Sequence, residues 1–138
     1  MLRMTFAAVI AACALSACAS PTSAGGGTTS TQESTMRTIT AGASTQMAHD
    51  ETVRLPDGAL LRFVGVPQDS RCPPNAKCIR AGDADLDFEY ALASGPKTSV
   101  KPNLPEAPSK NMGPWRLTVE ALEFTEHGAV TVRVDPAQ

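Results

Sequence analysis

The spacing of apolar residues constrains the fold most, because they recur at every second position through much of the chain after residue 35. Residues 84–92 show this most clearly: the apolar set is Leu86, Phe88, Tyr90 and Leu92, and the alternating acidic set is Asp83, Asp85, Asp87 and Glu89. Successive side chains of a strand point to opposite faces of a sheet. The pattern therefore predicts a strand with one face in the core and the other in water.

The same period predicts further strands, separated by turn signals. Residues 52–55 and 60–66 flank Pro56-Asp57-Gly58, residues 115–124 and 130–134 flank His127-Gly128, and weaker apolar patterns cover residues 36–40 and 98–101. We expect the strands on either side of His127-Gly128 to pair as a hairpin.

In residues 115–124 the parity of the apolar positions changes after Val119 and then continues at Leu122 and Phe124, which predicts a bulge near Glu120-Ala121. With about five to seven short strands and no helical period, residues 36–138 are predicted to form an all-β domain, either a small antiparallel β-sandwich or an open barrel.

Residues 1–17 have the pattern of a signal peptide, with a basic Arg3 and an apolar run from Phe6 to Leu15 that is too short to span a bilayer. Leu15-Ser16-Ala17-Cys18 resembles the lipobox of bacterial lipoproteins. The resemblance implies that Cys18 carries diacylglycerol and becomes the first residue of the mature chain. An ordinary leader cleaved after Ala19 is the alternative, and it would discard Cys18. In lipoproteins an aspartate after the cysteine retains the protein at the inner membrane, so Ala19 implies the outer membrane, facing the periplasm.

Residues 18–35 are rich in Gly, Ser and Thr and contain no large apolar side chain, which predicts a disordered, flexible tether. The chain as a whole has 12 basic and 14 acidic residues, a net charge of −2, and no basic cluster. We therefore expect no nucleic-acid partner, and membrane attachment through the lipid on Cys18 alone.

Cys72 and Cys78 are the two thiols that remain if Cys13 leaves with the leader and Cys18 is lipidated. An exported protein meets an oxidising compartment, so the pair is predicted to form a disulfide. The chain-entropy model gives such a short ring about 2–2.5 kcal/mol of stabilisation. A redox-active pair typically has two intervening residues at a helix start, whereas this pair has five and no predicted helix, so a structural role is favoured.

The segment around these cysteines resembles a family of uncharacterised bacterial secreted and lipoprotein-type β-domains. The matching residues are Asp69, Ser70, Arg71, Cys72, Pro73, Cys78, Ala81 and Gly82, followed by the strand from Ala84. The resemblance implies a β-sandwich in an exported protein and implies no activity. The sequence departs from the family at Arg80, where tryptophan is usual, so the role of that aromatic does not carry over.

Three groups of polar residues are candidates for chemical sites. His49 and His127 are far apart in sequence and lack partners at ligand spacing, so they are predicted to be separate surface histidines rather than a metal site. The acidic row of residues 83–89 is predicted to be a solvent face rather than a calcium site, because nothing in the row makes its carboxylates converge. Ser70 has no neighbouring histidine to act as a base, which argues against a hydrolase nucleophile.

Residues 69–82 are the predicted interaction loop, with Asp69, Arg71, Lys77 and Arg80 as its candidate contact residues. Asp69 and Arg71 are expected to form an ion pair that pins the loop. The leading hypothesis is a non-enzymatic binding or accessory module of the bacterial envelope with a protein partner, without catalytic residues, metal or cofactor. Two alternatives stay open: a protease inhibitor that presents Lys77 on the Cys72–Cys78 loop, and an enzyme that acts on envelope polymers through the acidic strand.

Overall fold

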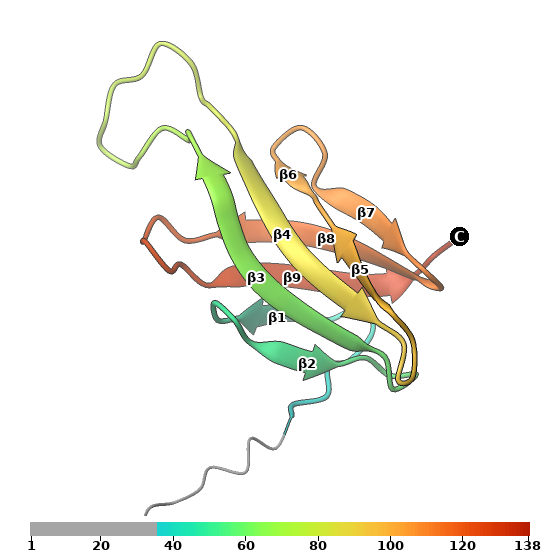
Figure 1. Cartoon of the computed structure of the whole chain (residues 1–138). Coiled ribbons are helices and arrows are strands. Elements are labelled where there is room, and N and C mark those ends of the chain that lie inside the picture. Colours follow the sequence, from blue (N-terminus) through green and yellow to red (C-terminus); the bar gives the residue numbers. More distant parts are fainter. Residues whose placement is uncertain (1–35) are drawn as a thin grey trace, which may run out of the picture. The chain divides into compact units, whose positions relative to one another are not determined.

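The computed structural model describes residues 36–138, which form two antiparallel sheets around a shared core (Figure 1). The predicted signal peptide, Cys18 and the tether of residues 18–35 lie outside the described residues. Between residues 36 and 138, no helix has the length and hydropathy that a membrane span requires. The predicted all-β class is confirmed: the two antiparallel sheets form a sandwich-like fold and do not close into a barrel.

The strands divide between a four-stranded and a five-stranded sheet. The first has the order β1-β9-β8-β7, with β1 at Ser44–Met47, β9 at Val130–Pro136, β8 at Trp115–Leu122 and β7 at Ser109–Met112. The second has the order β2-β3-β4-β5, with β2 at Thr52–Arg54, β3 at Leu60–Asp69, β4 at Ala84–Ala91 and β5 at Lys97–Val100; the short β6 at Asn103–Leu104 also pairs with β4. All of these pairings are antiparallel.

Strand β4 confirms the alternation read from the sequence, because its residues are alternately buried and half-buried along its whole length. Phe88 packs against Phe63 of β3 with the ring centroids 5.1 Å apart. The prediction for Leu92 was wrong: β4 ends at Ala91, the chain turns there, and the Leu92 side chain is exposed.

The predicted hairpin of β8 and β9 is confirmed, and so is the bulge, since the register between these strands shifts between Val119 and Ala121. Leu122 is buried as expected. Phe124 was wrongly assigned to the core face, because β8 ends at Leu122 and Phe124 lies exposed in the loop that follows.

The strand predicted for residues 36–40 does not form, and Thr38 makes only an isolated bridge with Arg54. Residues 36–138 contain nine strands, more than the five to seven predicted, because β1, β6 and β7 carry no recognisable alternation. The core nevertheless comes from the predicted apolar positions on both sheets, including Leu61, Phe63, Leu117 and Val132, all of which are almost completely buried.

Candidate interaction site

The 14 residues between β3 and β4, residues 70–83, form a long loop that we call the arm. Figure 1 shows the arm projecting beyond the two sheets at one end of the sandwich. The predicted disulfide between Cys72 and Cys78 is present and closes a small ring within the arm. The β1–β2 turn (residues 48–51) and the β8–β9 loop (residues 123–129) lie at the same end, which we call the arm end.

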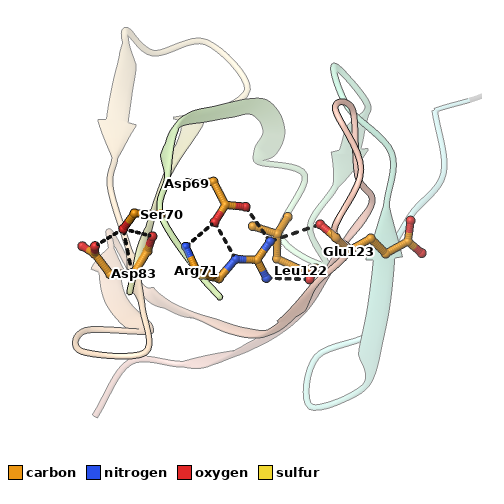
Figure 2. A network of polar contacts seen from close by, with 6 residues as sticks. All are labelled: Asp69, Ser70, Arg71, Asp83, Leu122 and Glu123. Atoms are coloured by element: carbon orange, nitrogen blue, oxygen red, sulfur yellow. Dashed lines mark hydrogen bonds and ion pairs between the residues drawn. The ribbon is translucent and has the colours of Figure 1, made fainter. Parts of the chain in front are cut away.

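Backbone hydrogen bonds join the two ends of the arm at its base. The Ser70 amide donates to the Asp83 carbonyl (2.8 Å), and the Cys72 amide donates to the Ala81 carbonyl (2.7 Å). The Ser70 hydroxyl contacts the Asp83 carboxylate at 2.8 Å (Figure 2). Gly82 is required here, because its φ is +70° and a Cβ would collide with the Ser70 carbonyl. Ser70 therefore has a structural partner in the arm itself.

Arg71 fastens the arm to the opposite sheet. Its guanidinium donates to both Asp69 carboxylate oxygens (2.9 and 2.6 Å) and to the carbonyls of Leu122 (2.8 Å) and Glu123 (3.2 Å), as Figure 2 shows. It also lies 4.0 Å from the centroid of the Phe124 ring, a cation–π contact. These hydrogen bonds from Arg71 lower the pKa of the Asp69 carboxyl. The expected ion pair is thus present, and it belongs to a larger anchor that joins β3 to the end of β8.

The far part of the arm is open to solvent. Lys77, Ile79 and Arg80 are all exposed, and Ile79 is fully so. Ile79 is an interaction candidate that the sequence reading missed; the available signal was an apolar residue between two cations in a segment with no strand period. Because Arg80 is exposed, position 80 does not contribute to the core.

The acidic side chains of residues 83–89 are paired with other side chains of the same domain. Asp83 and Asp85 both accept from the Asn103 amide (2.8 and 2.9 Å), Asp87 contacts Lys101 (3.2 Å), and Glu89 contacts Lys97 (3.0 Å). The hydrogen bonds from Asn103 and then Ser70 lower the pKa of Asp83.

Glu89 also pairs with Arg62 at 3.2 Å, and hydrogen bonds from Lys97 and then Arg62 lower its pKa. The same contact with Glu89 raises the pKa of Arg62. The carboxylates of the row are therefore committed to contacts across the sheet. In residues 36–138, no three histidine, cysteine or acidic side chains lie close enough together to hold a metal ion.

The two histidines are not separate, contrary to the sequence-based prediction. The rings of His49, from the β1–β2 turn, and His127, from the β8–β9 loop, lie with their centroids 4.8 Å apart. The sequence reading failed because the pairing of β1 with β9 brings together two loops that are distant along the chain.

Comparisons with protein-family models, with curated proteins and with solved structures give no significant match. The resemblance to secreted and lipoprotein-type β-domains therefore stays a prediction.

Proposed function

We propose that this protein is a non-enzymatic binding module of the bacterial envelope, and that the arm is its contact surface. The lipid on Cys18 would hold the domain at the periplasmic face of the outer membrane, with residues 18–35 as the tether. The observation that carries the proposal is the contrast within the arm, which has a base fastened by Arg71 and a solvent-exposed tip that includes Ile79.

A fastened base reduces the entropy lost on binding. The Arg71 side chain is only 12% exposed and contacts both Asp69 and the end of β8, so the start of the arm is fixed to the sandwich before a partner arrives. The disulfide further restricts the residues of the ring. Preorganisation of this kind favours binding, because less conformational freedom remains to be lost in the complex.

The chemistry of the tip indicates the kind of partner. Ile79 supplies an apolar side chain, and Lys77 and Arg80 supply positive charge on either side of it in the sequence. A fully exposed isoleucine gains free energy when a partner covers it, about 1.5–3 kcal/mol for complete burial. The complementary surface is an apolar pocket with an acidic rim on another envelope protein.

The protease-inhibitor alternative places different demands on the same loop. An inhibitory loop presents an extended backbone around its specificity residue. Here the Ala76 amide donates to the Pro73 carbonyl (3.1 Å) and Asn75 has φ of +72°, so a tight turn directly precedes Lys77. This geometry favours the binding module. Titration of trypsin with the purified protein distinguishes the two, since an inhibitor gives stoichiometric loss of cleavage and the binding module gives none.

Site-specific photo-cross-linking in the host tests the proposal. A photoreactive amino acid is placed at Ile79 and, as the matched control, at Ser94, which is exposed in the β4–β5 turn at the opposite end of β4. We expect a discrete cross-linked protein from position 79 and none from position 94. A Lys77→Glu/Arg80→Glu variant should abolish that product, because an acidic rim repels the reversed charge.

A second control uses Leu92, which is an exposed apolar residue like Ile79 but lies at the other end of the sandwich. Leu92→Asp should leave the cross-link from position 79 unchanged, since Leu92 lies at the distant end of β4. Equal yields from positions 79 and 94, or a product that survives the charge reversal, would show that the arm is not a specific contact surface.

A further inference from the structure

The chain has two histidines, and the fold places both at the arm end. Their rings are 4.8 Å apart between centroids and tilted by 54°. Two ligands of a tetrahedral ion with metal–nitrogen bonds of 2.0–2.1 Å lie roughly 3.4 Å apart, and rings at this separation can present nitrogens at that spacing. The ring separation thus falls in the range of two imidazoles that share one metal ion.

Neighbouring groups lie against both nitrogens of the His49 ring. Its Nδ1 lies 3.3 Å from an Asp50 carboxylate oxygen, and the other oxygen of Asp50 accepts from Arg62 at 2.8 Å. The opposite nitrogen, Nε2, faces Gly65 of β3, where a Cβ would lie at 2.9 Å and where the β3–β4 register shifts. A carboxylate thus lies beside Nδ1, and Nε2 lies close to the backbone of residue 65, where any side chain would collide with the ring.

A carboxylate on the far nitrogen of a histidine is the usual outer-shell partner of a metal ligand, since it selects the tautomer and raises the basicity of the ligating nitrogen. Imidazole ligands suit Zn²⁺, Ni²⁺ and Cu²⁺, and affinity is highest for Cu²⁺. His49 also lines a hollow of about 240 Å³ with Val64, Gly65 and Asp87, which leaves space for water beside His49.

We propose that His49 and His127 bind a divalent transition-metal ion, with Asp50 as the positioning residue. No third protein ligand is available among residues 36–138, so water completes the coordination. Such an ion would join the β1–β2 turn to the β8–β9 loop. That loop begins at Glu123, whose carbonyl accepts from Arg71, so the ion would brace the surface on which the arm is fastened. This site does not depend on the proposed protein partner.

Isothermal titration calorimetry tests the proposal. The full-length protein, purified from its host, is titrated with Cu²⁺ and, separately, with Zn²⁺. We expect one ion per chain and tighter binding of Cu²⁺. The electron paramagnetic resonance spectrum of the Cu²⁺ form should show coupling to two imidazole nitrogens, which can come only from these residues because the chain has no other histidine.

Variants give the second readout. His49→Asn and His127→Asn should each lower the Cu²⁺ affinity at least tenfold, and Asp50→Asn should lower it about tenfold, the usual effect of removing an outer-shell carboxylate. Glu106→Gln, an exposed carboxylate in the β6–β7 loop, is the matched control and should bind as the unaltered protein does. Saturating metal should raise the unfolding midpoint of the unaltered protein and leave that of the double histidine variant unchanged.

The spectrum of the unaltered protein decides the question even if a variant folds poorly. An unaltered protein without saturable binding, a spectrum without imidazole coupling, or equal affinity in the folded double variant would overturn the proposal.

Discussion

At the scale of single residues, Asp57 joins the two sheets at the end opposite the arm. It lies in the β2–β3 turn and accepts from the Trp115 indole of β8 at 2.8 Å and from the Ala59 amide at 3.0 Å. Nearby, the Tyr90 hydroxyl is buried and has no hydrogen-bond partner among the described residues. Burial, followed by the charge of Asp57, raises the pKa of Tyr90.

Tyr90→Phe should therefore leave the free energy of unfolding unchanged or raise it by about 1 kcal/mol, since a buried hydroxyl without a partner costs free energy to desolvate. Urea unfolding at neutral pH measures the change. Tyr90→Ala, which also removes the ring, is the control and should cost about 3–5 kcal/mol. A marked loss of stability in the Phe variant would show that the hydroxyl is hydrogen-bonded.

At the scale of elements, the arm is held by side chains rather than by a continued ladder. Strands β3 and β4 separate after Asp69↔Ala84, and beyond that pair the base depends on Ser70, Cys72 and the reach of Arg71 to Leu122 and Glu123. Lysine has the same charge as arginine but lacks the planar fork that contacts a carboxylate and two carbonyls together.

Arg71→Lys should loosen the arm while leaving the sheets intact. We expect faster hydrogen exchange at the Ser70 and Cys72 amides and unchanged exchange at Leu117 and Val132 in the core. The loss of global stability should be roughly 1–3 kcal/mol. Arg80→Lys, at the exposed tip, should change none of these values. Unaltered protection of Ser70 and Cys72 in the Arg71 variant would contradict this account of the anchor.

At the scale of the whole molecule, three carboxyl groups on β3, the arm and β4 have a lowered pKa in the folded protein: Asp69, Asp83 and Glu89. As pH falls, the unfolded chain takes up protons on these groups before the folded protein does. Their stabilisation is therefore fully present above the unfolded pKa values of about 4 and is lost as pH falls through the folded values.

The unfolding midpoint in urea should thus be nearly constant between about pH 5 and 7 and should decrease below about pH 4. Asp83→Asn should reduce the steepness of that decrease, because one of the responsible groups no longer titrates. The control is Glu106→Gln. Glu106 is exposed and its side chain makes no ion pair or hydrogen bond within residues 36–138, so this variant should leave the curve unchanged. A midpoint that rises on acidification would contradict the assigned direction of the pKa shifts.

The strands that the sequence predicts most clearly are the long ones that contribute a row of buried side chains to the core. β4, β8 and β9 alternate apolar and polar side chains over at least six residues, and β3 begins with a largely apolar run after the Pro56-Asp57-Gly58 turn signal, so these strands are visible without the fold. β1, β6 and β7 have two to four residues and mostly polar side chains, and they form because β9, β4 and β8 offer them backbone hydrogen bonds. A strand stabilised by its neighbour has little sequence signal of its own.

For the candidate site, the sequence determined the disulfide ring and the Asp69–Arg71 pair, because both join residues that are close along the chain. Only the tertiary structure decided that Arg71 reaches Leu122 and that His49 lies beside His127. Alternating side chains specify which face of a strand is buried but not which strands become neighbours. Contacts between distant loops follow from the order of strands in the two sheets, and the folded chain sets that order when it packs both apolar faces into one core.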